Sequence, residues 1–360
     1  MWPYWLMFLV PALAALNAPW CPPAAVTGWR PTRLDASWWL AILALTLLIG
    51  FRFQVGGDWG SYLRQFDATD GLELAAVLAK SDPGYWVLNW FSAQAGWGIY
   101  GVNLLCGAIY SIGLAVLCRS LPRPWLALAV SVPYLLLVLA MGYTRQGVAL
   151  GLAMLGLVAL GRRSTLPFVG WVLLGATFHR SAVILLPIAA LASARNRYWP
   201  LFWVGVVSLG AYVLLLQQEV DQLFVNYVDA RMQSSGALIR LAMNAVPAIV
   251  LLLWRRSFIF AESERRLWLW IAILSLVLLG LGVASPATTA VDRIALYLLP
   301  LQLVVFSHLP EVFGLPGRRN EDLVWVVLLY YGAVLYVWLN FAVNSNYWIP
   351  YRFYLFESGG

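Results

Sequence analysis

The stretch Met141-Gly-Tyr-Thr-Arg-Gln-Gly-Val148 places an arginine and a glutamine at the start of a hydrophobic run that continues as Ala149-Leu-Gly-Leu-Ala-Met-Leu-Gly156. A guanidinium at the edge of a membrane span is costly unless an anion or water accompanies it, so Arg145 is a candidate functional residue. Charge interrupts apolar sequence in two further places, Phe51–Trp59 and Thr177–Ser181. We therefore predict one polar site that is built from several helix ends.

The composition indicates a protein that lies almost entirely in a membrane. Of its 360 residues, 62% are hydrophobic and 11% are charged, and the mean hydropathy is +0.77. A soluble domain cannot bury that much apolar surface. Because a span needs about 17 to 25 apolar residues, the chain predicts an all-α polytopic membrane protein with roughly ten to twelve transmembrane helices. We expect a single integral membrane domain over residues 1–360.

The basic residues predict the orientation of these spans. The net charge of +7 arises from arginines in short loops, which the positive-inside rule places in the cytoplasm, so it does not indicate nucleic acid binding. Alternation then predicts external regions at about 52–97, 217–237 and 344–360. The expected spans are about 2–18, 37–51, 99–118, 124–141, 145–161, 200–216, 238–254, 267–284, 290–309 and 323–343.

One segment does not fit a simple alternation of full spans. The basic loops at 162–163 and 195–197 should both be cytoplasmic, although only about 30 residues separate them. Two short helices that meet at His179 and Arg180 satisfy this requirement, so we predict a re-entrant or short-helix hairpin around residues 166–194. Irregular backbone at that depth is tolerated where it lines a watered cavity that the protein encloses.

The orientation sends a set of charged residues to the external side, and their convergence is the internal sign of a site. The set comprises Arg52, Asp58, Arg145, His179, Arg180, Asp292 and Arg293. Simpler explanations remain open for several members. Arg52 can snorkel from the end of its span, Asp58 can cap the turn that follows Gly56 and Gly57, and Asp292 with Arg293 can form a local ion pair.

Several kinds of chemistry have no sequence support. The chain contains no Walker lysine loop, no His-Glu-x-x-His, no Gly-x-Ser-x-Gly and no Asp-x-Asp pair. The three cysteines Cys21, Cys106 and Cys118 lack metal-ligand spacing. We therefore expect no metal dependence.

Five short motifs follow one another along the chain, namely Arg52 through Asp58-Trp59 with Tyr62, Asp82-Pro-Gly-Tyr85, Thr144-Arg-Gln-Gly-Val-Ala149, Phe178-His-Arg-Ser-Ala182 and Asp292-Arg-Ile-Ala-Leu-Tyr297. Their order and rough spacing resemble the EpsG family, the Wzy-like exopolysaccharide and O-antigen polymerases of bacterial inner membranes. The resemblance covers roughly residues 35–310. The chain departs from the resemblance at Asp82, where such proteins commonly carry the longer glutamate.

The resemblance implies glycosyl transfer between undecaprenyl-diphosphate-linked oligosaccharides at the external face of the bacterial inner membrane. Membrane lipid surrounds such a protein, and a polysaccharide co-polymerase and a flippase are candidate partners. The leaving group is a lipid diphosphate, so arginines should stabilise its developing charge, and a base should take the proton of the attacking hydroxyl. The activated donor carries its own energy, so the resemblance implies no cofactor.

These demands assign a role to each candidate residue. The expected catalytic residues are His179, Asp58 and Arg145. The expected diphosphate ligands are Arg52, Arg145, Arg180 and Arg293. The expected contacts to the acceptor sugar are Gln146, Tyr62, Tyr85 and Asp292. Of the two candidates, we hypothesise that His179 is the base, because its reference pKa is about 6.5, whereas that of Asp58 is about 3.9.

Two alternative functions remain open at this point. A membrane glycosyltransferase that uses polyprenyl-phosphate sugars would also place an acid such as Asp58 in the first external region. A flippase for lipid-linked oligosaccharides should carry charges through the middle of its spans, whereas here they lie mainly at the ends.

Overall fold

Apolar runs of the sequence form the helices of the structure. The computed structural model describes residues 1–18, 34–188, 202, 236–284, 288–315 and 318–357. Within these residues all regular elements are helical, and an isolated β-bridge joins Arg52 to Phe353. The predicted all-α fold class is confirmed.

The helices of the first half of the chain follow the expected spans closely. They are α1 (Trp2–Asn17), α3 (Ala36–Gly50), α4 (Trp59–Asp67), α5 (Leu74–Leu78), α6 (Pro83–Gln94), α7 (Gly98–Arg119), α8 (Pro124–Ser131) and the π-helix η1 (Val132–Ala140). Asp35 caps α3, because its carboxylate accepts hydrogen bonds from the backbone N–H of Ser37 and Trp38 at 3.1 and 3.2 Å. Pro133 has no N–H for an α-helical bond, and the helix widens to the π register there.

The second half of the chain contains both long spans and short helices. They are α9 (Thr144–Gly161), α10 (Thr165–Ala176), the 3₁₀ helix η2 (Arg180–Leu185), α14 (Ala237–Leu253), α15 (Glu262–Ala284), α16 (Thr288–Ala295), η5 (Leu296–Leu298), α17 (Pro300–Phe313), α18 (Glu321–Phe341), η6 (Ser345–Tyr347) and α19 (Tyr354–Glu357).

Within the described residues, five helical segments are long and apolar enough to cross a membrane, namely Gly98–Arg119, Thr144–Gly161, Glu262–Ala284, Val291–Phe313 and Glu321–Phe341. Shorter apolar helices accompany them at Trp2–Asn17, Ala36–Gly50, Pro124–Ala140, Thr165–Ala176 and Ala237–Leu253. The chain is therefore a multi-pass membrane protein. The expected span at 200–216 and most of the expected external region 217–237 lie outside the described residues.

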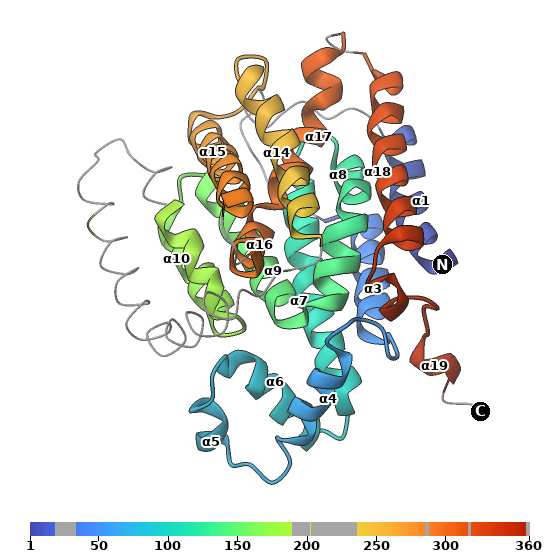
Figure 1. Cartoon of the computed structure of the whole chain (residues 1–360), viewed down its shortest axis with the longest axis vertical. Coiled ribbons are helices and arrows are strands. Elements are labelled where there is room, and N and C mark those ends of the chain that lie inside the picture. The colour runs from blue at the N-terminus through green and yellow to red at the C-terminus, as the bar shows by residue number, and fades with distance from the viewer. Residues whose placement is uncertain (19–33, 189–201, 203–235, 285–287, 316–317, 358–360) are drawn as a thin grey trace.

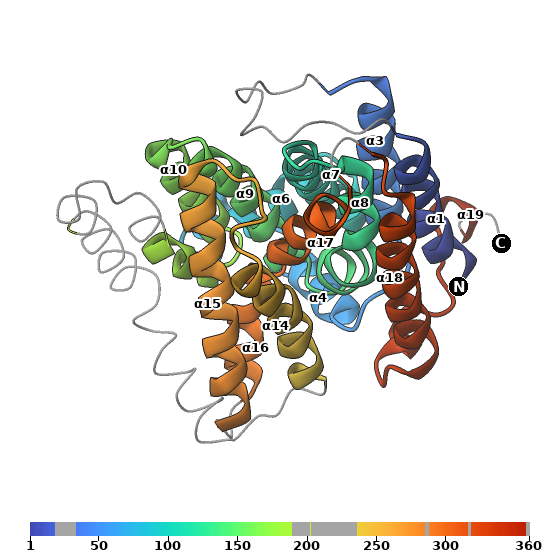
Figure 2. The same cartoon turned by 90° about the horizontal axis from the view of Figure 1, so that it is seen from above.

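Glycine allows the helices at the centre of the bundle to approach closely. A Cβ atom on Gly151 of α9 would lie 2.8 Å from the Cα atom of Tyr110 on α7, and one on Gly113 of α7 would overlap the carbonyl of Gly151. Small residues permit this approach of two backbones, as the spacing of Gly147 and Gly151 indicates. Seen along the bundle, α7, α8 and α17 are at the centre, with α1 and α18 on one side and α10 on the other (Figure 2).

The two ends of the bundle differ in kind. At one end, which we call the site end, α4, α5 and α6 lie together below the long helices (Figure 1). The C-terminal segment pairs with residues 51–56 at this end, where Phe53 N–H donates to Arg352 O at 3.0 Å and Gly56 N–H donates to Tyr347 O at 2.9 Å.

Within the predicted external region 344–360, the described residues are thus packed against the bundle. Tyr4 of α1 donates to the carbonyl of Trp348 at 2.7 Å, and the indole of Trp348 donates to the carbonyl of Leu137 at 2.9 Å. Trp348 is buried. The C-terminal segment therefore connects α1, the π-helix η1 and the loop after α3 through hydrogen bonds.

The opposite end, which we call the basic end, gathers the arginine-rich loops. Arg123 forms an ion pair with Glu311 at 2.8 Å and donates to the carbonyl of Arg319 at 2.7 Å. Ser263 donates to the carbonyl of Gly161 at 2.5 Å, beside Arg162. Loops that the sequence assigns to one side of the membrane therefore meet at one end of the structure.

Two local expectations change in the structure. The short connection between the expected spans 267–284 and 290–309 already contains the start of helix α16 at Thr288, and Asp292 and Arg293 belong to this short helix. The expected hairpin at 166–194 begins with α10, whose 12 residues span about 18 Å, less than the roughly 30 Å of a hydrocarbon core. Residues 189–194 of this hairpin lie outside the described residues.

The two ends predict a labelling pattern. In a protein whose native cysteines are replaced by alanine, a cysteine at Asp70 of the site end should react with an impermeant maleimide in intact spheroplasts. A cysteine at Arg318 of the basic end should react only after lysis, because the positive-inside rule places that end in the cytoplasm. Both positions are exposed, so the reverse pattern would place the site in the cytoplasm.

Candidate active site

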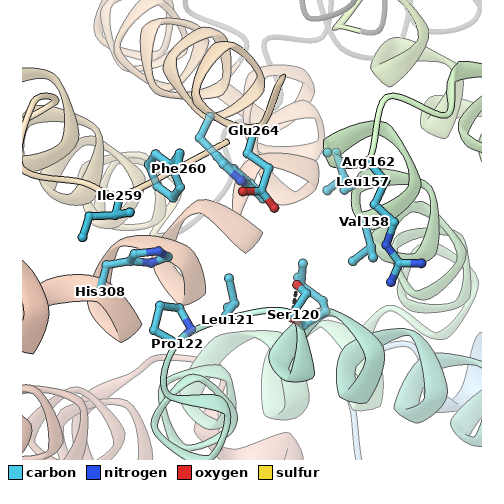
Figure 3. Close-up of a pocket in the computed structure, with 13 residues that line it drawn as sticks. Ser120, Leu121, Pro122, Leu157, Val158, Arg162, Ile259, Phe260, Glu264 and His308 are labelled. Carbon is cyan, nitrogen blue, oxygen red and sulfur yellow. Dashed lines mark hydrogen bonds between the residues drawn. The ribbon is translucent and has the colours of Figure 1, made fainter. Parts of the chain in front are cut away.

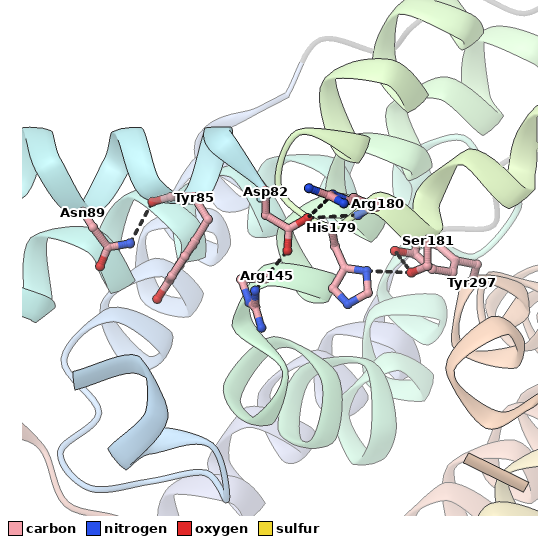
Figure 4. Close-up of polar contacts among 8 residues, drawn as sticks. All are labelled: Asp82, Tyr85, Asn89, Arg145, His179, Arg180, Ser181 and Tyr297. Carbon is pink, nitrogen blue, oxygen red and sulfur yellow. Dashed lines mark hydrogen bonds and ion pairs between the residues drawn. The ribbon is translucent and has the colours of Figure 1, made fainter. Parts of the chain in front are cut away.

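One carboxylate joins two arginines at the site end. Asp82 accepts a hydrogen bond from Nη1 of Arg145 at 2.9 Å through Oδ2. Its Oδ1 accepts from the backbone N–H of Arg180 at 3.3 Å and lies 3.9 Å from Nε of the same residue. Figure 4 shows the carboxylate between the two guanidinium groups. Asp82 therefore connects the start of α9 to the start of η2.

The motif Asp82-Pro-Gly-Tyr85 explains how this carboxylate reaches the arginines. Pro83 occupies the first turn of α6, where its missing N–H costs nothing. Gly84 donates its N–H to Thr177 O at 2.8 Å and lies so close to Thr177 that a side chain would overlap it. Asp82 has a left-handed backbone (φ 54°) and makes no capping bond. Strain of this kind is typical of functional sites.

Arg145 lies in the first turn of α9, as the sequence predicts. Its side chain is 35% exposed, and it interacts with the phenol of Tyr62 as well as with Asp82. The ring of Tyr62 packs against that of Tyr85, with centroids 5.6 Å apart. Tyr85 is fully buried, so it packs against Tyr62 in the protein interior and does not reach the surface of the site.

His179 lies between α10 and η2, outside the spanning helices. Its Nδ1 is 2.6 Å from Oγ of Ser181, and that hydroxyl donates to the hydroxyl of Tyr297 at 3.1 Å. Burial, together with the positive charges of Arg145 and Arg293, lowers the pKa of His179 to about 3. The imidazole is therefore neutral near pH 7, although it is a weaker base than the reference value of about 6.5 suggested.

Asp58 follows a glycine that brings the chain close to the start of α9. Gly56 has φ 105°, and a Cβ atom there would lie 2.6 Å from the carbonyl of Met141. Asp58 occupies the N-cap position of α4, but its side chain makes no capping bond. Burial raises the pKa of Asp58 above its usual value, and Arg293 and Arg145 oppose this shift. The same two arginines act on His179 and Asp58, so both groups face one positively charged region.

Arg293 reaches this region from α16. Its guanidinium lies 4.7 Å from the ring centroid of Tyr143, and its carbonyl accepts a hydrogen bond from Nε2 of Gln146 at 2.8 Å. The preceding Asp292 pairs with Arg240 of α14 through two hydrogen bonds of 2.7 and 2.6 Å. The partner of Asp292 in this ion pair therefore comes from another helix, whereas the sequence had left open a local pair with Arg293.

Arg52 lies beneath the other arginines. It is 1% exposed, and it donates to Oγ1 of Thr144 at 2.7 Å and to Oδ1 of Asn103 at 3.2 Å. Its guanidinium also lies 5.8 Å from the ring centroid of Trp59. No ion pair involves Arg52 within the described part of the chain. It joins the end of α3 to the starts of α4 and α9.

Burial separates the sequence-predicted residues into two groups. The partly exposed group is Asp58, Arg145, His179, Arg180 and Arg293. The buried group is Arg52, Tyr62, Tyr85, Gln146 and Asp292. Direct contact with a substrate remains a prediction for all ten, and exposure favours the first group. The buried group lies behind it and holds the helix ends in place.

Sequence reasoning gave no role to several residues of this cluster. Asp82 stood out in the sequence only as a departure from the pattern of the EpsG family. Its position directly before Pro-Gly was the signal of a fixed backbone. Ser181 and Tyr297 lie within quoted motifs without an assigned role. Arg240 carried no signal at all, because its partner Asp292 is 52 residues away in the chain.

A separate cavity lies at the basic end, between the ends of α7 and α9 and residues 259–268 (Figure 3). Its polar groups are engaged by nearby backbone. His308 bonds to Val304 O at 2.7 Å, Ser120 donates to Leu117 O at 2.6 Å, and Glu264 accepts from Ala261 N–H at 3.3 Å. We place the candidate site at the other end, where partly exposed charges converge.

The buried ion pair between Arg240 and Asp292, which we call the buried clamp, predicts that removing Arg240 lowers the stability of the protein. Both side chains are largely buried, with 11% and 6% of their surfaces exposed. Arg240→Gln should destabilise the protein by about 3 to 5 kcal/mol, because it removes one partner of a buried ion pair. Thermal unfolding in detergent, followed by tryptophan fluorescence, measures the effect, and adding Asp292→Asn should recover much of it.

A second variant provides a matched control for this prediction. Arg266 and Glu262 form an ion pair on the surface, with 35% and 53% of their side chains exposed. Arg266→Gln should cost less than about 1 kcal/mol. Equal losses in Arg240→Gln and Arg266→Gln would contradict a buried clamp.

Comparison with known proteins now gives the family of the chain. No curated protein and no solved structure shows a significant match. The sequence model of the EpsG family, in contrast, matches residues 36–353, and this range includes every motif on which the resemblance was based. The chain belongs to the EpsG family.

Proposed function

We propose that the protein is a polysaccharide polymerase that transfers undecaprenyl-diphosphate-linked oligosaccharide repeat units onto one another. Membership of the EpsG family supports a polymerase-like function. The observation that carries the specific proposal is the convergence of three partly exposed arginines, Arg145, Arg180 and Arg293, beside His179 and Asp58. Positive charge of this kind suits a diphosphate.

The charges at Asp82 support a site that accepts an anion. Arg145 and Arg180 both pair with Asp82, and the charge of Arg293 acts on the same region, so three guanidinium groups lie near this part of the site. A guanidinium has five N–H donors. Arg145 uses one nitrogen for Asp82 and also interacts with the phenol of Tyr62. Its donors beyond these two contacts suit phosphate oxygens, which match the fork of an arginine. Asp82 holds the two arginines together until the diphosphate binds.

The position of Arg145 adds to this preference for an anion. The first turn of α9 begins at Thr144, and the backbone N–H groups of a helix N-terminus favour negative charge. A diphosphate at this point meets both the helix terminus and the guanidinium. Charge that develops on the leaving oxygen is stabilised by donors that are already in place.

The proposed step is a single glycosyl transfer. The hydroxyl oxygen of the acceptor forms a bond to the anomeric carbon of the donor, and the bond from that carbon to the diphosphate oxygen breaks. The electron pair of the broken bond stays on the lipid diphosphate, next to the arginines. The hydroxyl proton passes to Nε2 of His179.

A weak base suffices for this proton transfer. Glycosyl transfer proceeds through an oxocarbenium-like transition state, and the attacking hydroxyl becomes strongly acidic as its bond to carbon forms. A neutral imidazole with a lowered pKa can therefore accept the proton late in the step. Asp58, which faces the same arginines, is proposed to orient the acceptor sugar.

The location of the site agrees with a substrate that is anchored in a membrane. The cluster lies where helices end at the site end, so a lipid diphosphate group at the membrane surface reaches it while its polyprenyl chain remains in the hydrocarbon. We propose that this is the periplasmic face of the bacterial inner membrane, since the arginine-rich loops lie at the other end. A flippase that delivers the units and a co-polymerase are the proposed partners.

The central test uses the purified protein and a defined lipid-linked repeat unit. Wild-type protein should produce oligomers of the repeat unit on lipid. Arg145→Lys keeps the charge but loses the fork, so kcat/KM should fall at least about tenfold. Arg64→Lys is the matched control, because Arg64 is exposed on α4 at the same end, and among the described residues its side chain hydrogen-bonds to Ser61 and not to a residue of the site.

Other outcomes of this test identify the alternatives. Movement of the lipid-linked unit across the bilayer without oligomers would indicate a flippase. Addition of one sugar from a polyprenyl phosphate would indicate the other class of glycosyltransferase. Equal activity of Arg145→Lys and Arg64→Lys would remove Arg145 from the diphosphate site.

The pH dependence separates the two candidate bases. A base works in its deprotonated form, and a group with a pKa of about 3, as in His179, stays deprotonated from about pH 5 to about pH 8. The kcat/KM of the wild type should therefore be flat over this range. His179→Gln should lower it about 10²-fold or more throughout, while Asp58→Asn should chiefly raise KM for the acceptor.

The opposite result would exchange these roles. The pKa of Asp58 is raised, so activity that depends on its carboxylate would fall as the pH decreases through that raised value. An acidic limb in the wild-type profile that disappears in Asp58→Asn would make Asp58 the base and overturn the role of His179.

A further inference from the structure

Three side chains form a hydrogen-bonded row behind the site. Nδ1 of His179 lies 2.6 Å from Oγ of Ser181, and this oxygen lies 3.1 Å from the hydroxyl oxygen of Tyr297 (Figure 4). Tyr297 is 1% exposed. The row connects the imidazole to a buried phenol of η5, and neither hydroxyl has a part in the proposed chemistry.

The local backbone produces the first contact of this row. His179 is extended, and the 3₁₀ turn closes with a bond from Ala182 N–H to His179 O at 3.0 Å. This tight turn brings Ser181 back over the imidazole, two residues further along the chain. The second contact depends on tertiary structure, since Tyr297 comes from the segment that also carries Arg293.

The protons of this row follow from simple counting. A serine hydroxyl has one proton to donate. If Ser181 donates it to Tyr297, its oxygen can only accept from the imidazole, so Nδ1 of His179 carries the proton. Nε2 then presents a lone pair on the opposite side of the ring, away from Ser181.

The reversed row, in which Ser181 donates to Nδ1, would place an N–H bond at Nε2 and leave no lone pair there to accept a proton. In either row, the positive charges of Arg145 and Arg293 disfavour a second proton on the imidazole.

We propose that Ser181 and Tyr297 are positioning residues that hold His179 in the Nδ1–H tautomer, so that Nε2 is ready to accept the proton of the acceptor hydroxyl. This inference rests on the proposed function for its consequence, but the tautomer itself can be observed without any substrate. Neighbours of an imidazole commonly fix its tautomer in this way.

The test uses the small number of histidines in the chain. The protein contains two, His179 and His308, so selective ¹⁵N labelling of histidine ring nitrogens gives two pairs of signals in lipid nanodiscs near pH 7. His308→Gln assigns the pair that belongs to His179. The wild type should show a protonated Nδ1 and an unprotonated Nε2 for His179.

The variants are chosen so that each breaks one link. Tyr297→Phe does not touch the imidazole, but it frees the proton of Ser181 for Nδ1, so the tautomer should change toward Nε2–H. Ser181→Ala removes the acceptor at Nδ1 and should change it in the same direction, while Ser181→Thr should preserve it. Tyr110→Phe is the matched control, because it removes a buried hydroxyl bond to Leu135 O at a distance from the site.

Activity provides the second readout. With a lipid-linked repeat unit, Tyr297→Phe and Ser181→Ala should lower kcat about tenfold and leave KM for the donor unchanged, and Ser181→Thr and Tyr110→Phe should retain kcat. A wild-type Nε2–H tautomer would overturn the inference, as would a tautomer that Tyr297→Phe leaves unchanged. Absence of polymerisation by the wild type would instead count against the proposed function, whatever the tautomer.

Discussion

The ion pairs of Asp82 with Arg145 and Arg180 are the interaction on which the site depends. Each arginine begins a helical segment at the site end, and guanidinium groups so close together repel one another without an anion. One carboxylate of α6 offsets this repulsion and fixes the distance between α9 and η2. The left-handed backbone of Asp82 shows that α6 is held against its local preference to keep this contact.

Close backbone contacts allow the charged helix ends to meet. Gly84 brings α6 against the end of α10, Gly56 brings the loop after α3 against Met141, and Gly151 brings α9 against α7. A side chain at any of these positions would push the two elements apart. The hydrogen bonds between the helix ends would then become too long to persist. Packing in the bundle and geometry at the site are therefore one constraint.

The buried polar residues form a second layer that serves the exposed charges. Arg52 bonds to Thr144 at the start of α9, Gln146 bonds to the carbonyl of Arg293, and Asp292 is bound by Arg240. These residues can affect the site without contacting a substrate. They determine where Arg145 and Arg293 point, and small displacements at a site for charge stabilisation lower its effect.

The sequence by itself determined the class and the two ends of this protein. Its composition requires a membrane, its arginine-rich loops identify the spans, and short motifs from Arg52 to Tyr297 predict that several helix ends converge. These properties follow from local patterns, because hydrophobic runs and loop charge act where they occur in the chain.

Only the tertiary structure decided which charges pair and how they titrate. Asp292 pairs with Arg240 and not with its neighbour Arg293, and Asp82 becomes the partner of two arginines from other segments. His179 is a weaker base than its reference value because burial and two distant arginines act on it. Electrostatic interactions depend on distance in space and on desolvation, and neither quantity can be read from positions along the chain.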